Sequence, residues 1–362
     1  MMGFQTLASN KIDDLKWNEF IASVPFGHHV QTSLWGQVKA TLNWKTERIL
    51  VTDQNGHITA GAQILIRSMT PLFTVAYLTK GPVLSSEDPS MAKTIIQYAI
   101  QISRKNHAQI LAIQPPNNGT SIMLPLSECG FQPSSLELAP VASLIVDLTP
   151  GENQLLDQMK RQTRQNIHRS EREGIVVRVG GVDDLAAFYR LHTATSLRQK
   201  FAPYPFKYFQ KLWDIFEPHG HIKLFIAEYN HVPVSVLLTI PFGNTVIAKI
   251  FGWSGDYAQL RPNDAIFWNA IKWSKIHGYN YFDFEGIDVN GAKAILAGNS
   301  LPETLRHSPD FLKLGFGGQV VLYPPAYDMV YNPIFQWVYK MASPKIGGQS
   351  IPSQVIDRLR KL

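Results

Sequence analysis

The sequence predicts a two-domain α/β protein in which one strand–strand–helix–strand unit occurs twice. The chain has 362 residues, about right for two domains of ~150 residues each. Its hydrophobic fraction of 45%, with 17% charged residues, is typical of well-packed cores and excludes disorder. Two stretches about 172 residues apart share one order of apolar runs and helical periodicity.

The two copies of the repeat match element by element. In the first copy we expect strands at residues 58–66 and 73–78, a helix at 90–107 and a strand at 108–113. In the second copy we expect strands at residues 232–240 and 245–251, a helix at 263–277 and a strand at 279–284. Apolar helix positions fall in register, Ile95 with Phe267 and Ala99 with Ile271. A unit repeated in this way implies duplication.

This order of elements is that of the acyl-CoA N-acyltransferase-like (GNAT-like) fold, so the sequence predicts tandem domains of that fold, with mixed sheets and flanking helices. Ordinary members hold the cofactor pyrophosphate on a glycine-rich turn that opens the central helix. The equivalent turns here, residues 85–89 and 259–263, contain no glycine. Pro89 and Pro262 also lack a backbone N–H group. Acetyl-CoA is therefore disfavoured as the donor.

The domain boundary is predicted near residue 147. The first domain is expected over residues 1–147, rejoined by 323–362, and the second over 148–322. Residues 144–148 are expected to form a closing strand, followed by a break and then by a helix over 152–172. Thr149 is expected to cap this helix.

Composition narrows the class of partner and the compartment. A net charge of +6 favours polyanionic partners such as nucleic acid, phosphorylated substrates or an acidic membrane face, or else only aids solubility. A single cysteine, Cys129, excludes an intramolecular disulfide and a cysteine-based metal site, and the histidines lack metal-ligand spacing, so we expect no metal. With neither a signal peptide nor an apolar run of membrane-spanning length, we expect a cytoplasmic protein.

The helix expected over residues 152–172 carries a basic stripe. Residues 158–170 include no acid and contain the candidate tRNA- or phosphate-binding residues Lys160, Arg161, Arg164 and Arg169. Such a stripe suits binding to an RNA backbone, and it equally fits a solvated helix face.

Asp283 and Glu285 alternate at a strand end, so their side chains share one side. They could act together in acid–base chemistry. Alternatively, Asp283 caps the turn at Gly286.

Several motifs follow one another in a fixed order along the chain. They are residues 31–39 (QTSLWGQVK), 159–174, the T..R block 195–198, 281–287 (YFDFEGI), 311–318 (FLKLGFGG) and 327–333 (YDMVYNP). This succession resembles the Fem (FemABX) family of tRNA-dependent aminoacyltransferases that form peptidoglycan bridges. The similarity covers nearly the whole chain, and the chain is similar to the short members without a coiled-coil arm.

The resemblance implies an enzyme that transfers an amino acid from aminoacyl-tRNA, its co-substrate, to the stem peptide of a UDP- or lipid-linked peptidoglycan precursor. No cofactor is implied. Lys313 matches the lysine assigned to the transition state, and Lys39 and Arg198 match positions that hold the precursor's diphosphate. Trp35 and Asp283 complete the predicted substrate-binding set. We expect a monomer, with possible peripheral contact to the inner membrane face.

The sequence departs from the family pattern at several positions. Leu312 replaces the aromatic residue before the lysine, and Gln114-Pro115 replaces an aspartate–proline pair that could have supplied a base. Lys249 or Phe251 stands where a tyrosine is expected. Residues 288–310 are predicted to form a long loop, a candidate substrate lid.

Two other functions fit the same fold. One is an acyl-CoA-dependent N-acyltransferase acting on a cell-envelope sugar or polysaccharide, which the glycine-poor turns disfavour. The other is a non-catalytic binding module for RNA or precursor, compatible with Leu312 and Gln114. The tail over residues 344–362 ends in basic residues that could contact RNA or lipid headgroups.

Overall fold

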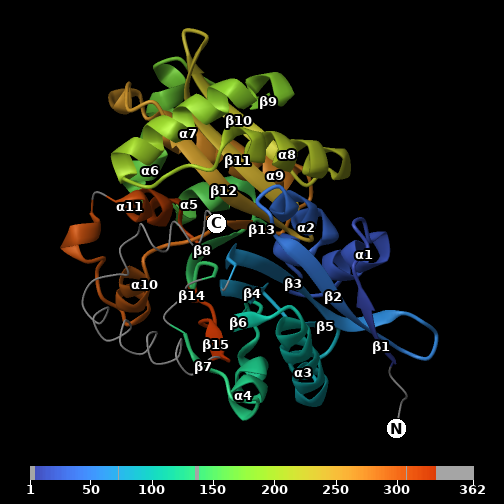
Figure 1. The fold of residues 1–362 in the computed structure, drawn as a ribbon. Helices are drawn as coiled ribbons and strands as arrows, with labels where there is room; N and C mark the ends of the chain where they lie inside the picture. Colours follow the sequence, from blue (N-terminus) through green and yellow to red (C-terminus); the bar gives the residue numbers. More distant parts are fainter. Residues whose placement is uncertain (1–4, 72, 135–137, 307, 332–362) are drawn as a thin grey trace. The chain divides into compact units, whose positions relative to one another are not determined.

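The chain folds into two compact units (Figure 1). A computed structural model describes residues 5–71, 73–134, 138–306 and 308–331. The first unit comprises residues 1–139 and 323–362, and the second comprises residues 140–322. The tail at 344–362 and the end of the YDMVYNP motif lie outside the described residues. Each unit is built on a mixed sheet, and the predicted GNAT-like fold is confirmed.

The described part of the first unit contains an eight-stranded sheet in the order β1-β2-β3-β4-β6-β15-β7, with β5 paired to β3. Its strands are β1 (Gln5–Ser9), β2 (Lys45–Thr52), β3 (Ile58–Thr70), β4 (Phe73–Thr79), β5 (Val83–Leu84), β6 (Ala108–Gln114), β7 (Gln132–Pro133) and β15 (Tyr327–Val330). The pair β4–β6 is parallel, and β15 runs antiparallel to β6.

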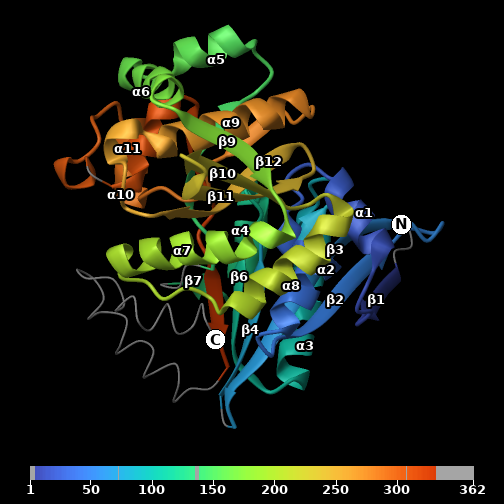
Figure 2. The ribbon, with the colours of Figure 1, turned by 90° about the horizontal axis from the view of Figure 1, so that it is seen from above.

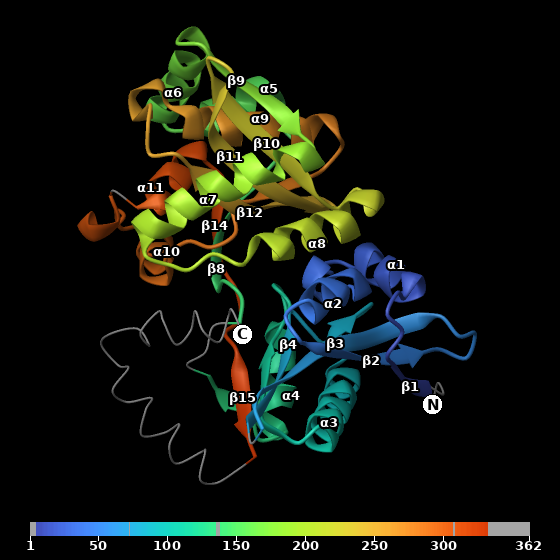
Figure 3. The same cartoon turned by 45° about the horizontal axis from the view of Figure 1, so that its top comes forward.

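Helices cover both faces of this sheet. They are α1 (Leu15–Ser23), α2 (Ser33–Ala40), α3 (Pro89–Lys105) and α4 (Thr120–Glu128). Figure 3 shows α1 and α2 on one face and α3 on the other. Gly61 of β3 permits the close approach of α1, since a methyl group there would lie 2.7 Å from the Trp17 ring. Its neighbour Ala62 points the other way and is buried in one core with Ile95 and Ala99 of α3.

The described part of the second unit contains a seven-stranded sheet in the order β14-β8-β13-β12-β11-β10-β9. Its strands are β8 (Ala142–Asp147), β9 (Ile175–Gly180), β10 (Lys223–Tyr229), β11 (Val232–Phe242), β12 (Thr245–Trp253), β13 (Tyr281–Asp283) and β14 (Gln319–Leu322). The pair β12–β13 is parallel, as β4–β6 is in the first unit. The predicted repeat therefore corresponds to real structure.

The helices of the second unit also lie on both faces, as Figure 2 shows for α7 and α9. They are α5 (Glu152–Gln158), α6 (Arg161–Arg172), α7 (Leu185–Gln199), α8 (Phe206–Phe216), α9 (Pro262–Ile276), α10 (Val289–Leu296) and α11 (Pro309–Lys313). A methyl group on Gly252 of β12 would lie 2.6 Å from the His192 backbone nitrogen, so α7 packs directly on this strand. Phe251 points to the opposite face and stacks on Phe267 of α9.

The two central helices begin at prolines, with carboxylates in their first turns. Pro89 and Pro262 are the first residues of α3 and α9, one position where the missing N–H group costs no helical hydrogen bond. The Asp88 carboxylate accepts hydrogen bonds from the amides of Ser90 and Met91, so Asp88 caps α3. Asp264 is buried in the first turn of α9. An incoming phosphate would meet these carboxylates.

Three predicted elements differ in the structure. The strand expected to close the first domain, β8, pairs instead with β13 and β14 in the second sheet. The helix expected over residues 152–172 is two helices, because the chain turns at Met159 and Lys160, where the Lys160 amide donates to the Gly315 carbonyl at 2.9 Å. The cap of the first of these helices is Gly151, not Thr149, and its amide donates to the Gln154 side chain at 3.0 Å.

The predicted long loop over residues 288–310 is largely folded against the second unit. Asp288 caps α10 by accepting a hydrogen bond from the Gly291 amide at 2.8 Å. Ala292 is fully buried in the core of the second unit. The Asp288 amide in turn donates to the Asp310 carboxylate at 2.9 Å, which joins the start of α10 to α11. The described part of this segment is therefore packed against the second unit, unlike a substrate lid.

Candidate functional site

Lys313 lies at the end of α11, beside the turn that follows β13. Its Nζ donates to the Gly286 carbonyl at 2.5 Å and to the Glu285 carbonyl at 3.3 Å. Ser308 caps α11 by accepting from the Asp310 amide at 3.2 Å, which fixes where the helix begins. The lysine of the FLKLGFGG motif is therefore anchored to the backbone of the YFDFEGI motif.

Glycines hold this motif against the turn between α5 and α6. A methyl group on Gly315 would collide with the hydroxyl of Thr163, and one on Gly317 would lie 2.6 Å from the Gln158 carbonyl oxygen. Gly317 also has a φ of +77°, a conformation that glycine adopts without strain. The glycines thus allow the close contact that places Lys313.

Burial changes the proton affinity of Lys313. It lowers the pKa of the half-buried ammonium group, and attraction to the carboxylates of Asp310, Glu285 and Asp283 partly opposes that shift. A lysine of lowered pKa gives up a proton more readily than an exposed one. Its position and its acidity both suit donation to an oxygen on which negative charge develops.

Asp283 acts as the cap of its turn. Its Oδ1 accepts from the Glu285 amide at 2.8 Å and from the Ser143 hydroxyl. The carboxylate is buried and shapes the backbone that holds Lys313. Of the two interpretations given by the sequence, the structure favours the capping one.

Glu285 pairs with Lys249 of β12, with Nζ and Oε1 2.5 Å apart. Their side chains are only 22% and 15% exposed. The sequence pattern places Lys249 or Phe251 at an expected tyrosine position and Glu285 beside Asp283, and it does not reveal the pairing of Lys249 with Glu285. A lysine inside the otherwise apolar run of β12 was the available signal.

Arg198 binds the end of β12. Its guanidinium donates to the Ser254 carbonyl at 2.9 Å and to the Trp253 carbonyl at 2.5 Å, and it lies 5.1 Å from the centroid of the Trp253 ring. Thr195, the other residue of the T..R block, accepts from the Trp253 amide at 2.8 Å. Arg198 is exposed, and its guanidinium has five N–H donors. The donors that face solvent could bind phosphate.

Lys39 and Trp35 belong to α2 in the first unit. The Lys39 ammonium lies 5.1 Å from the centroid of the Trp35 ring, a cation–π contact. Trp35 is buried and packs edge-on against His29 at 5.3 Å. Trp35 therefore supports Lys39 from beneath.

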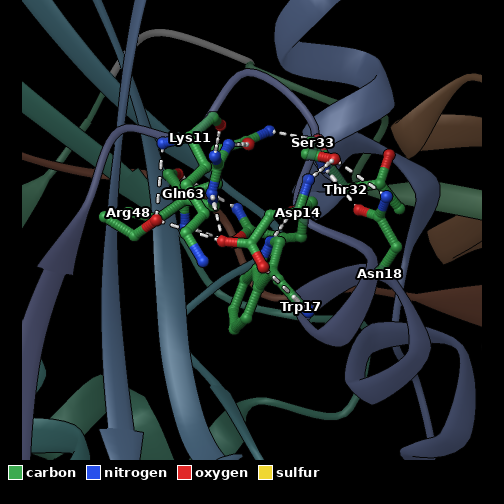
Figure 4. A network of polar contacts seen from close by, with 10 residues as sticks. Lys11, Asp14, Trp17, Asn18, Thr32, Ser33, Arg48 and Gln63 are labelled. Carbon is green, nitrogen blue, oxygen red and sulfur yellow. Dashed lines mark hydrogen bonds and ion pairs between the residues drawn. The ribbon is translucent and has the colours of Figure 1, made fainter.

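Gln31, Thr32 and Ser33 of the QTSLWGQVK motif belong to a buried polar network (Figure 4). The backbone N–H of Gln63 donates to Gln31 Oε1 at 2.7 Å, and the side-chain Nε2 of Gln63 donates to the Thr32 carbonyl at 2.7 Å. Arg48 donates to Gln63 Oε1 at 3.1 Å and pairs with Asp14 at 3.7 Å. These contacts position α2, which carries Lys39.

The basic residues of α6 divide by role. Arg164 donates to the Leu156 carbonyl at 3.1 Å and the Met159 carbonyl at 2.6 Å, so it caps the end of α5. Arg169 lies 4.0 Å from Glu173. Lys160 and Arg161 are exposed, and Lys160 Nζ lies 5.3 Å from the centroid of the Phe311 ring, in the motif that carries Lys313.

No group of three or more histidine, cysteine, aspartate or glutamate side chains among the described residues could hold a metal ion. No helix within the described ranges is long and apolar enough to cross a membrane.

The paired sheets, each with a crossover helix between parallel strands, define a tandem acyltransferase-like protein. An acetyltransferase (GNAT) domain model matches residues 157–293. The FemAB family model matches residues 12–122, in agreement with the resemblance that the motifs predicted.

The chain is also similar to curated relatives and, in its fold, to solved structures. The chain is 23% identical over 234 residues to the lipid II:glycine glycyltransferase of Staphylococcus saprophyticus subsp. saprophyticus, covering 62% of this chain and 56% of that protein. It thus spans about half the length of the curated relatives it matches. The crystal structure of FemX aligns with a TM-score of 0.79 at 18% identity, covering 92% of this chain and 100% of the other. A tandem GNAT protein from the clavulanic acid pathway aligns at 0.55 with 8% identity, covering 91% and 99%.

Proposed function

We propose that this protein is an aminoacyltransferase that moves an amino acid from aminoacyl-tRNA to the stem peptide of a peptidoglycan precursor. The observation that carries the proposal is the placement of Lys313. A glycine-packed motif holds its ammonium on the Gly286 carbonyl, and burial lowers its pKa. The relatives are lipid II:glycine glycyltransferases, and this activity supports the same class of reaction.

The reaction converts an ester into an amide. The amine of the stem peptide attacks the ester carbonyl carbon, and negative charge develops on the carbonyl oxygen. Lys313 stabilises that oxygen, and the ribose hydroxyl of the tRNA then leaves. Stabilisation of this kind acts mainly in the transition state, so it raises the rate more than it tightens substrate binding.

The remaining candidate residues would anchor phosphate groups. Arg198 and Lys39 are proposed to hold the diphosphate of the precursor, which is either UDP-linked or lipid-linked. Lys160 and Arg161 are proposed to contact the tRNA backbone near its acceptor end, because they are exposed and Lys160 lies on Phe311, two residues before Lys313. The carboxylates at the starts of α3 and α9 argue against a CoA pyrophosphate there.

The proposal is tested by incubating the purified protein with a mixture of charged tRNAs and either lipid II or the UDP-linked precursor. Mass spectrometry should detect a precursor heavier by one amino-acid residue. Lys313→Met should lower single-turnover transfer by roughly 100-fold or more, as the loss of one oxyanion donor does in other enzymes. The matched control is Lys293→Met, which changes an exposed lysine of α10 and should leave transfer unchanged.

Each contrary outcome has a distinct meaning. If the wild-type protein forms no product with any charged tRNA but acetylates an acceptor from acetyl-CoA, it is an acyl-CoA enzyme. If it binds precursor and tRNA but transfers nothing, it is a binding protein. Full transfer by the Lys313 variant would remove Lys313 from the mechanism.

A further inference from the structure

Lys249 occupies a bulge in β12. Leu238 pairs with Ile250, but the next residue, Thr239, pairs with Ala248, which leaves Lys249 as the extra residue of the strand. A bulge breaks the regular alternation of side chains and can turn one of them towards a site. Here it directs the Lys249 ammonium to the Glu285 carboxylate, 2.5 Å away.

Glu285 has an unusual backbone conformation. Its φ of +37° is rare for residues other than glycine, and such strain persists only where the surroundings impose it. Asp283 imposes it by accepting from the Glu285 amide, and Lys313 donates to the Glu285 carbonyl. The bulge in β12 and the positive φ after β13 therefore both help to place the Glu285 carboxylate.

The Glu285 carboxylate is held by a specific ion pair. Within the described ranges, Lys249 is the only side chain bonded to it. Burial raises the pKa of the Tyr208 phenol of α8, and Tyr204 and the charge of Glu285 raise it further. The Glu285 carboxylate thus combines a fixed cation with partial exposure.

We propose that Glu285 is the proton acceptor of the transfer reaction, and that Lys249 is a positioning residue that holds its carboxylate in place. This inference rests on the proposed function, since it needs an attacking amine beside Lys313. It supplies a base that the sequence lacks at Gln114, whose amide is fully buried and bonded to the Ala139 and Pro324 backbone.

The proposed step balances without a further reactant. The lone pair of the stem-peptide amine forms the C–N bond, and the carbonyl electrons move to the oxygen stabilised by Lys313. The nitrogen becomes positively charged as the bond forms, so its proton becomes acidic enough to pass to the Glu285 carboxylate. The carbonyl re-forms, the C–O bond to ribose breaks, and Glu285 returns the proton to the ribose oxygen.

Glu285→Gly is the sharpest test, because glycine adopts a positive φ without strain and the fold should tolerate it. The variant removes the carboxylate and leaves room for a small acid. In single turnovers with glycyl-tRNA and lipid II, or with the charged tRNA and precursor that give wild-type product, its rate should fall roughly 100-fold or more. Added formate should restore at least a tenth of the wild-type rate, while precursor affinity stays within threefold.

Companion variants separate a base from a structural residue. Glu285→Gln keeps the side-chain shape and should be as slow as the glycine variant, but formate should not rescue it because the space is filled. Lys313→Met should be slow with and without formate. Lys249→Met should lose several-fold in rate, also without rescue.

Three results would overturn the inference. They are a glycine variant within threefold of the wild-type rate, a folded and slow glycine variant that formate does not rescue, and equal rescue of Lys313→Met. Each requires wild-type transfer to be observed. A wild-type protein without transfer on any charged tRNA refutes the proposed function itself, so the two failures are distinguishable.

Discussion

At the scale of single residues, Lys313 is held in an environment that disfavours its charge. Burial lowers its pKa, although the carboxylates of Asp310, Glu285 and Asp283 attract the ammonium. The Lys313 ammonium donates hydrogen bonds to two backbone carbonyls. A residue chosen only for stability would not need this arrangement, and strained or desolvated groups of this kind cluster at functional sites.

The lowered pKa of Lys313 has a consequence for stability against pH. In the unfolded chain the lysine has an ordinary pKa of about 10.4. Between the lowered folded pKa and that value, the unfolded state binds more protons, so stability rises with pH. The free energy of unfolding of the wild type should therefore rise relative to that of Lys313→Met, by at most about 1.4 kcal/mol per pH unit in this window.

Urea unfolding of both proteins between pH 7 and 10.5 measures this difference. Lys293→Met is again the control, since its side chain is exposed and its difference from the wild type should stay flat with pH. A flat difference for Lys313→Met as well would mean that burial does not disfavour its charge.

Among the single residues of the site, the sequence predicts Lys313 but does not predict the pairing of Lys249 with Glu285. The motif around Lys313 could be recognised because its glycines and lysine are fixed in order along the chain. The pairing of Lys249 with Glu285 could not, because it depends on a bulge that places an extra residue in β12. A shift of one residue turns a strand side chain to the other face, and the sequence alone does not locate such a shift.

At the scale of elements, the glycines of the FLKLGFGG motif allow it to pack on the corner between α5 and α6. Gly317 has a φ of +77°, and a methyl group on it would lie 2.6 Å from the Gln158 carbonyl. Gly298 has nearly the same φ, +78°, with nothing within 4 Å of such a methyl group. The two positions share a positive φ, but Gly317 also has a ψ of −158°, a combination that glycine alone adopts readily.

Gly317→Ala should therefore destabilise the protein by about 3 kcal/mol or more, and Gly298→Ala by about 1 kcal/mol. Denaturant unfolding gives both values. Transfer should fall only in the Gly317 variant, because its motif places Lys313. Equal losses at the two positions would show that neither the contact with α5 nor the ψ of Gly317 adds to the cost of a positive φ.

Arg164 and Arg161 differ in a similar way on α6. Arg164 bonds the last carbonyls of α5, whereas Arg161 is exposed. Arg164→Met should cost about 1–3 kcal/mol of stability because buried carbonyls lose their donor. Arg161→Met should change stability by less than about 0.5 kcal/mol, but it should lower the salt dependence of tRNA binding by about one ion.

Unfolding experiments and tRNA titrations at several salt concentrations check this pair of variants. A stable Arg164 variant with weakened tRNA binding would reverse the assignment. The sequence could not separate the two arginines, because it predicted one continuous helix. The capping role exists only because the chain turns at Met159 and Lys160.

At the scale of the whole molecule, the repeat was predictable and the chain's path between the units was not. The strands and central helices of the two copies have alternating and helical apolar patterns, which local sequence carries. The strand β8 has the same kind of pattern whichever sheet it joins, and only its pairing with β13 and β14 shows that it belongs to the second. Residues 288–306 contain glycine and serine, a composition that predicts a loop, although Asp288 caps a helix there.

Gln114 holds the two places where the chain leaves and re-enters the first unit. Its side chain donates to the Ala139 carbonyl at 3.1 Å and the Pro324 carbonyl at 3.4 Å, and it accepts from the Ala139 amide at 2.8 Å. The residue is fully buried. A single amide thus satisfies backbone groups from segments separated by the whole second unit in sequence, which is why a neutral residue with both a donor and an acceptor suits this position.

Gln114→Ala should destabilise the first unit by about 2–4 kcal/mol, because it leaves buried backbone donors and acceptors without partners. Hydrogen exchange should quicken in peptides that cover β6 and β15, which pair next to this contact. Gln162→Ala is the control, since that exposed side chain bonds only to Asn166 and should leave exchange unchanged. Unchanged exchange in the Gln114 variant would show that the pairing of β15 with β6 is enough to hold the returning segment. Gln114 would then not be needed to join the segments at Ala139 and Pro324.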